Sequence, residues 1–178
     1  MPQIIKDIIL ILVLIIVCLM FATLIINLFY TKAPYVPSSG NILKKILAEL
    51  KLKPGQIVYD LGCGDGRFLI QAEKLYKIHG IGYEMAPLPY LIARLYKLFT
   101  RSKCEIILGN FFKINLNQAD LIFCYLYPEI VTEVYHKAVK ECRPGTIMIS
   151  NTFSVKDVKP TKIVYNKKNK PQIYYYQI

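Results

Sequence analysis

The stretch "VYDLGCGDGRFLI", residues 58–70, decides the fold of this chain. An apolar run leads into Gly62, Gly64 and Gly66, and an amphipathic run follows them. Glycine tolerates positive φ and leaves room for a close neighbour. Glycines grouped between a buried strand and a helix are therefore typical of a turn that cradles a ligand. The sequence predicts a strand, a ligand-binding turn and a helix in succession.

Strands and helices alternate beyond this turn. We expect helices over 41–50, 66–77, 88–99 and 128–142, and strands over 56–61, 80–84, 104–109, 119–127 and 145–150. In the helix over 66–77, we expect Phe68, Leu69, Ala72 and Leu75 to face the core. Two more strands, 161–166 and 172–178, are separated by only five residues, which favours an antiparallel hairpin. Apolar strands flanked by helices indicate a parallel sheet covered on both faces.

The details of the glycine turn bear on the ligand. A dinucleotide turn has the pattern G-x-G-x-x-G, whereas this one is G-x-G-x-G with Arg67 at the next position. Asp60, two residues before Gly62, is unfavourable beside a pyrophosphate and favourable beside an ammonium group. S-adenosylmethionine carries an ammonium and a sulfonium. Glu84 ends the second strand, where a carboxylate can accept hydrogen bonds from ribose hydroxyls in either class of ligand.

A second polar and aromatic pair comes after the third strand. Asn110 and Phe111 belong to "GNFF", residues 109–112. A polar side chain there can meet an adenine amino group, and an aromatic neighbour can stack on the ring. The reversed terminal hairpin also differs from the sixth parallel strand that dehydrogenases usually add.

Taken in order, "VYDLGCGDGR", Glu84, "LGNFF" and the terminal hairpin resemble the class I S-adenosylmethionine-dependent methyltransferases over about residues 40–178. The resemblance implies an α/β, Rossmann-like seven-stranded methyltransferase sheet with a C-terminal antiparallel hairpin, preceded here by one transmembrane helix. It also implies S-adenosyl-L-methionine as cofactor. The residues expected to bind it are Asp60, Gly62, Gly64, Gly66, Glu84, Asn110 and Phe111.

A closer resemblance includes the N-terminal part of the chain. A single apolar span, then "PYVPS" at 34–38, then this core is similar to the small membrane-anchored protein-lysine methyltransferases. Their eukaryotic members modify the ATP synthase c-ring and the adenine nucleotide carrier, and prokaryotic relatives share the core. This resemblance implies that "PYVPS" helps to close the active site. A linker stiffened by proline is the other interpretation.

The N-terminal segment has no charged side chain from Ile8 to Tyr30, which is long enough to cross a bilayer as a helix. We expect an anchor over 1–31, a linker over 32–40 and a methyltransferase domain over 41–178. A cleaved signal and a buried soluble helix are the alternatives. Lysines come after the span, so the positive-inside rule predicts a single-pass membrane protein with its catalytic domain on the cytoplasmic side.

The acceptor is inferred from the residues that come directly after the fourth strand. Tyr125 and Tyr127 are the expected catalytic residues, because their rings can hold a lysine stem and a hydroxyl can relay a proton. "YLYPE" lacks the N/D-P-P-Y/F turn of enzymes that methylate adenine or glutamine amides. Cys124 is a weak candidate nucleophile, and no cysteine or histidine cluster has metal-ligand spacing. The main prediction is an N-methyltransferase for lysine on a protein at or in the membrane.

Three other functions stay open: a small-molecule or lipid methyltransferase, a non-catalytic S-adenosylmethionine-binding module, and an RNA methyltransferase. The net charge of +11 favours an anionic neighbour. We expect an anionic lipid surface rather than nucleic acid, because the span confines the domain near headgroups. A C-terminal lysine cluster is the candidate contact: Lys156, Lys159, Lys162, Lys167, Lys168 and Lys170.

Overall fold

The computed structural model describes residues 3–30, 40–166 and 168–178. Contacts divide the chain into two units, Met1–Pro34 and Tyr35–Ile178. The "PYVPS" segment and the expected linker, apart from Gly40, lie outside the described residues, as does Lys167.

The N-terminal unit is one apolar helix, α1 (Gln3–Tyr30). Its stretch from Gln3 to Ala22 has a mean hydropathy of 3.0, and none of it is buried. Among the described residues this is the one helix long and apolar enough to cross a membrane. From residue 8 to residue 22, leucine, isoleucine and valine occupy all sides of the helix.

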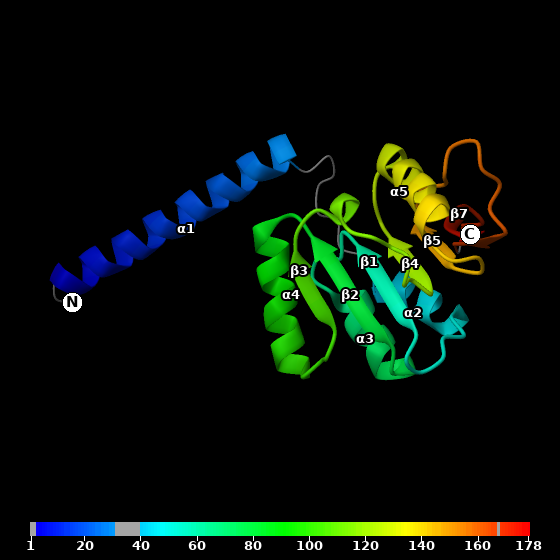
Figure 1. The fold of residues 1–178 in the computed structure, drawn as a ribbon. Helices are drawn as coiled ribbons and strands as arrows, with labels where there is room; N and C mark the ends of the chain where they lie inside the picture. Colours follow the sequence, from blue (N-terminus) through cyan, green and yellow to red (C-terminus); the bar gives the residue numbers. More distant parts are fainter. Residues whose placement is uncertain (1–2, 31–39, 167) are drawn as a thin grey trace. The chain divides into compact units, whose positions relative to one another are not determined.

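The second unit is a seven-stranded mixed sheet with helices on both faces (Figure 1). The strand order is β3-β2-β1-β4-β5-β7-β6. The first five strands are parallel: β1 (Ile57–Leu61), β2 (His79–Glu84), β3 (Glu105–Leu108), β4 (Leu121–Cys124) and β5 (Ile147–Asn151). The hairpin of β6 (Lys162–Tyr165) and β7 (Pro171–Gln177) completes the sheet, with β7 antiparallel to β5. The expected seven-stranded fold with its terminal hairpin is confirmed.

Two helical layers enclose the sheet. The main core joins α2 (Gly40–Glu49), α3 (Arg67–Tyr76) and α4 (Pro87–Thr100) to alternate strand residues such as Val58 and Phe123. The residues next to them in sequence, Tyr59 and Ile122, are also buried but point to the other face, which α5 (Pro128–Glu141) covers. Phe68 of α3 stacks on Phe123 of β4 with ring centroids 4.0 Å apart.

Two details differ from expectation. Leu75 is 61% exposed, and Tyr76 packs against the core instead, with its hydroxyl bonded to the Leu47 carbonyl. Tyr76 comes seven positions after Leu69, so both lie on the inward side of α3. The fourth strand ends at Cys124 rather than at residue 127. Tyr127 is followed by Pro128 and leads directly into α5, so pairing with β5 stops before it.

Candidate functional site

The candidate site lies where the strand order reverses. The chain runs from β1 outward to β2 and β3 in one direction, and continues with β4 and β5 on the other side of β1. In open α/β sheets, ligands bind outside the carboxyl ends of the strands at such a point. The carboxyl end of β1 is the glycine turn, which faces the segment after β4.

The glycine turn is built from backbone that ordinary residues avoid. Gly62, Gly64 and Gly66 have φ of 82°, 55° and 72°. The amides of Gly62 and Cys63 both donate to the Tyr83 carbonyl, at 2.9 and 3.0 Å, which ties the turn to β2. A Cβ on Gly62 would lie 2.9 Å from Leu126 Cδ2. Gly62 is therefore required both for its φ and for the close approach of Leu126.

Glu84 holds two loops together from the end of β2. Its Oε2 accepts a hydrogen bond from the Gly64 amide at 2.9 Å, and its Oε1 accepts one from the Ala86 amide at 2.8 Å. Its own carbonyl accepts from the Gly109 amide at 2.9 Å. Each carboxylate oxygen has a second lone pair, so the side chain can still accept hydrogen bonds from a ligand's hydroxyls.

Asp60 is a buried acid with two other carboxylates, those of Glu84 and Asp65, nearby. It is 2% exposed, on β1 between Gly82 of β2 and Phe123 of β4. Burial raises the pKa of Asp60 well above its ordinary value, and the nearby carboxylates of Glu84 and Asp65 raise it further. Asp65 is itself paired with Arg67, whose Nε donates to it at 2.7 Å. A cation bound beside Asp60 would favour its ionised form.

Asn110 and Phe111 lie beyond the end of β3, as expected. Asn110 Oδ1 accepts a hydrogen bond from the Phe112 amide at 2.9 Å and so caps the short 3₁₀ helix η1 (Phe111–Lys113). Phe111 is buried and its ring centroid is 4.7 Å from that of Phe112. The second lone pair of Asn110 Oδ1 can accept a hydrogen bond from an adenine amino group.

Tyr125 and Tyr127 lie in the segment between β4 and α5. Tyr125 is half-buried, and Tyr127 is 36% exposed and precedes the first turn of α5. The ring centroid of Tyr127 is 6.2 Å from that of Phe153, which comes after β5. Aromatic side chains from the ends of two neighbouring strands therefore meet at this edge of the sheet.

Sequence reasoning missed three residues here: Leu126, Asn151 and Phe153. Asn151 is fully buried at the end of β5, and its Nδ2 has no hydrogen-bond partner among the described residues. Next to it, Thr152 has a φ of 77°. The signal that points to Asn151 and Phe153 is their place at the end of, and shortly after, a parallel strand that neighbours β4, since the carboxyl ends of such strands share one edge.

Cys124 is not placed to act as a nucleophile. It has no exposed surface, and its Sγ–H donates to the Ile149 carbonyl at 3.6 Å. Burial raises the pKa of the Cys124 thiol to about 12, so it stays protonated at neutral pH. The weak sequence candidate for covalent catalysis is thus an inert core residue.

The arrangement fits the chemical groups of S-adenosylmethionine. Asp60 offers a carboxylate whose pKa is raised by burial and by the nearby acids Glu84 and Asp65, which suits an ammonium group. Glu84 has acceptor capacity for ribose hydroxyls, and the glycine turn lets the ligand approach the backbone closely. The aromatic edge of Tyr127 and Phe153 can form the wall of an acceptor channel.

Comparison with known proteins gives the family. Residues 60–162 match the model of the ANTKMT methyltransferase domain. The chain is 30% identical over 134 residues to a protein-lysine N-methyltransferase of Saccharolobus islandicus, covering 74% of this chain and 83% of that protein. It is 27% identical over 137 residues to the adenine nucleotide translocase lysine N-methyltransferase of Mus musculus. That match covers 75% of this chain but only 58% of the mouse protein.

Solved structures agree on the fold. An RNA methyltransferase from Salinibacter ruber in complex with S-adenosyl-L-homocysteine superposes with a TM-score of 0.75 at 24% identity, covering 80% of this chain and 94% of that one. A methyltransferase from Geobacter sulfurreducens in complex with the same molecule superposes with a TM-score of 0.58 at 22% identity, covering 83% and 59%. The chain therefore belongs to the ANTKMT methyltransferase domain family of class I S-adenosylmethionine-dependent methyltransferases.

Proposed function

We propose that this protein transfers a methyl group from S-adenosylmethionine to the side-chain nitrogen of a lysine on a protein at or in the membrane. The observation that carries the proposal is the similarity to proteins named as lysine N-methyltransferases, which covers about three quarters of the chain. The aromatic edge after β4 and β5 supports it, because aromatic walls suit a long aliphatic stem that ends in a nitrogen.

The cofactor supplies an electrophilic methyl: its S–CH₃ bond breaks, the electron pair stays on sulfur, and an N–CH₃ bond forms. The chain's part is to bind, orient and exclude water. Asp60 would pair with the ammonium group of the cofactor, and Glu84 would accept hydrogen bonds from its ribose hydroxyls. Leu126 and the rings of Tyr127 and Phe153 make the acceptor's surroundings apolar. Desolvation lowers the pKa of an incoming lysine, so its ammonium group releases a proton to water before transfer and the nitrogen exposes a lone pair.

Within this proposal, the ring and the hydroxyl of Tyr125 and Tyr127 can have different roles. Variants of Tyr127 distinguish the two. If the ring holds the lysine stem, Tyr127→Phe keeps activity and Tyr127→Ala loses it. If the hydroxyl relays the proton, Tyr127→Phe also loses kcat and shifts the pH profile. Tyr165→Ala, at a tyrosine of similar exposure on β6, is the matched control and should leave transfer unchanged.

The experiment is a transfer assay with the full chain in detergent. It receives tritiated S-adenosylmethionine and a membrane fraction from cells lacking the gene, and the products are separated into protein and lipid. Label on lysine of one membrane protein supports the proposal. Label in lipid alone contradicts it and favours a lipid methyltransferase. Cofactor binding without any transfer favours a binding module. Asp60→Asn should abolish the label, and Asp157→Asn, at an exposed loop position, should keep it.

We also propose that α1 is a retained anchor over residues 8–30 and that the catalytic unit over 41–178 is cytoplasmic. The uncharged span and the lysines that come after it support this orientation. A protease added to intact cells should leave the catalytic unit undigested, and digestion should occur only after lysis. Digestion in intact cells would reverse the orientation, and a shortened N-terminus in mass spectrometry would indicate a cleaved signal.

A further inference from the structure

Helix α4 is apolar on two opposite sides. Its inward side, with Pro89, Tyr90 and Ala93, packs against the core. Its outward side carries six large apolar side chains that are exposed, up to 70% for Leu98 and 83% for Phe99. A helix on a soluble domain ordinarily has one apolar stripe, which faces the core, and polar residues opposite. The outward side of α4 therefore needs its own explanation.

The six side chains form one continuous stripe. They are spaced by three, one, three, three and one residues, so they recur on one side along the length of the helix. We name this surface the outer stripe of α4; its members are Leu88, Leu91, Ile92, Leu95, Leu98 and Phe99. An exposed apolar surface this continuous marks an interaction site.

The charged side chains of α4 and of the turn directly after it are all basic. Residues 87–103 contain Arg94, Lys97, Arg101 and Lys103 and no acidic residue. Arg94 is exposed beside the stripe and lies over the Tyr90 ring, 5.9 Å from its centroid. An apolar stripe bordered by basic side chains is the pattern of helices that lie in the interface of an anionic bilayer.

We propose that the outer stripe of α4 docks on the surface of a bilayer that contains anionic lipids, with its apolar side chains at the boundary between headgroups and acyl chains. Charge complementarity favours this occupant over an apolar protein surface. With α1 as the anchor proposed above, the chain itself keeps the domain near the bilayer, because only nine residues separate α1 from α2. Nine residues span at most about 32 Å when fully extended.

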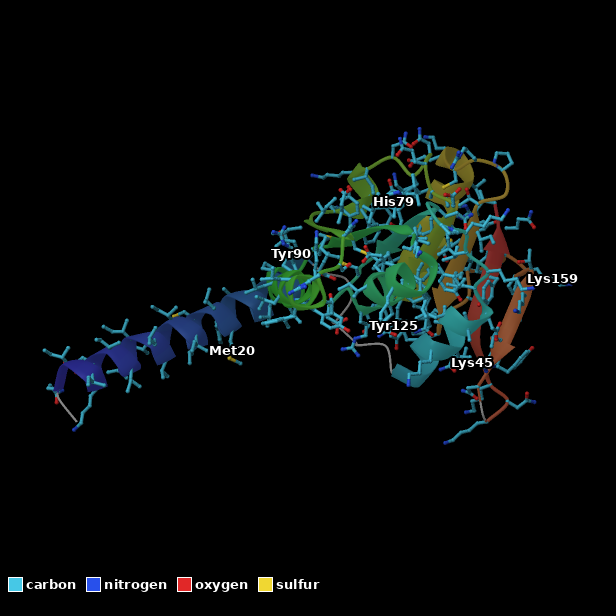
Figure 2. The ribbon with its side chains drawn as sticks, turned by 90° about the horizontal axis from the view of Figure 1, so that it is seen from below. Met20, Lys45, His79, Tyr90, Tyr125 and Lys159 are labelled. Atoms are coloured by element: carbon cyan, nitrogen blue, oxygen red, sulfur yellow. The ribbon has the colours of Figure 1, made fainter. Side chains whose placement is uncertain are left out.

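The place of α4 in the fold decides which side of the domain would face the lipid. The helix begins three residues after Glu84, so one end of the stripe adjoins the carboxyl edge of the sheet where the candidate site lies. It packs on β3 and β2, which lie at one end of the strand order, whereas the β6–β7 hairpin lies at the other end (Figure 1). Tyr90 of α4 and Lys159, from the lysine-rich C-terminal part, lie at opposite ends of the domain (Figure 2). The stripe and the C-terminal lysines are therefore competing candidates for the lipid-facing side.

The absence of tryptophan from the sequence gives a clean test. The full chain carrying Phe99→Trp is placed in nanodiscs of 70% phosphatidylcholine and 30% phosphatidylglycerol, with acyl chains brominated or not. We expect at least a twofold loss of fluorescence with brominated lipid, together with shielding from acrylamide. Tyr165→Trp on β6 is the matched reporter at the hairpin, and it should stay accessible to acrylamide and unquenched by bromine.

Every other pattern overturns the proposal. Phe99→Trp accessible to acrylamide and unquenched by bromine means that the stripe faces water. Shielding from acrylamide without bromine quenching means that protein covers the stripe. Quenching of Tyr165→Trp alone assigns the lipid-facing side to the hairpin. Adding Leu91→Glu to the Phe99→Trp reporter should abolish bromine quenching, whereas Val139→Glu on α5 should not. The readout is independent of methyl transfer, so it stands or fails separately from the proposed reaction.

Discussion

The carboxylate of Glu84 accepts a hydrogen bond from the backbone amide of Gly64 across 2.9 Å, and so joins the end of β2 to the glycine turn. Its other oxygen is bonded to the Ala86 amide. Both oxygens thus accept hydrogen bonds from N–H groups. A glutamine side chain has one oxygen and one NH₂ group, so its NH₂ group would face one of these N–H donors.

Glu84→Gln is therefore expected to weaken both the turn and the cofactor site. One backbone amide loses its acceptor, which costs about 1–3 kcal/mol of stability. We expect the affinity for S-adenosylhomocysteine, measured by calorimetry, to fall at least tenfold. Glu73→Gln is the matched control, since Glu73 also accepts a backbone hydrogen bond, from Lys103 at 2.8 Å, but at the opposite edge of the sheet. It should lower stability and leave the affinity unchanged; equal losses of affinity would contradict the assignment.

Asp60 is expected to make the cofactor-free protein less stable as pH rises. Burial, Glu84 and Asp65 hold the pKa of Asp60 in the folded chain well above the ordinary value of 3.8. Between these two pKa values the folded chain keeps a proton that the unfolded chain has released, so a higher pH favours unfolding. The stabilising contribution is complete below pH 3.8 and is lost as pH rises towards the folded-state pKa.

Asp60→Asn removes this titration. Urea unfolding of both proteins across a pH series should show a decline in the wild type that the variant lacks, once the remaining pH dependence is subtracted. Cofactor affinity in the wild type should change in the opposite sense and strengthen with rising pH, because ionised Asp60 can pair with an ammonium group. Identical pH dependence of stability in the two proteins would rule out a raised pKa.

Two glycines with nearly the same φ allow backbone strain to be separated from side-chain crowding. Gly62 has φ 82° and Gly55 has φ 83°, but a Cβ on Gly55 would have no neighbour within 4 Å, whereas one on Gly62 would meet Leu126 at 2.9 Å. Gly55→Ala should cost about 1 kcal/mol for the left-handed backbone. Gly62→Ala should cost about 1–3 kcal/mol more for overpacking and should also weaken cofactor binding. Both are measured by urea unfolding.

The crowding has its own check in a double variant. Adding Leu126→Ala to Gly62→Ala relieves the close approach, so the combined loss of stability should be smaller than the sum of the two single losses. Strict additivity would show that Leu126 does not limit the turn.

Cys124→Ala should leave methyl transfer essentially intact. The thiol is buried and its pKa is raised to about 12, so no thiolate is available for attack. We expect about 1 kcal/mol of lost stability from the missing sulfur. The measurement is kcat for methyl transfer at saturating cofactor, with circular dichroism to verify the fold. A folded but inactive variant would restore Cys124 as a nucleophile.

The sequence allowed the frame of the site to be predicted because its chemistry is local. The glycine turn, Asp60 and Glu84 each lie within or at the end of an apolar strand, and parallel strands bring such ends to one edge. Glu84 meets Gly64 across 20 residues of sequence because β1 and β2 are neighbours. The alternation of strands and helices predicted the parallel strands, and the short spacing of the last two strands predicted the antiparallel hairpin.

The features that the sequence did not reveal depend on packing between distant segments. The contact of Leu126 with Gly62, and of Tyr127 with Phe153, arises only when β1, β4 and β5 are aligned. The end of β4 at Cys124 is set by where pairing with β5 stops, which the apolar run to residue 127 conceals. The outer stripe of α4 was hidden for a related reason. Its side chains have the same residue types and the same spacing as those of a helix side that faces the core. Only the position of the helix on the sheet shows which side of α4 is left exposed.

The position of β7 inside the sheet affects how the protein is made. β6 precedes β7 in the chain, yet β7 is its partner and lies between β6 and β5. A nascent chain that has released only as far as β6 leaves β5 with an open edge, and such edges recruit strands from other molecules. A released chain that is truncated between residues 165 and 171 would keep the domain in this state. Such truncations are expected to produce aggregation rather than a smaller folded enzyme.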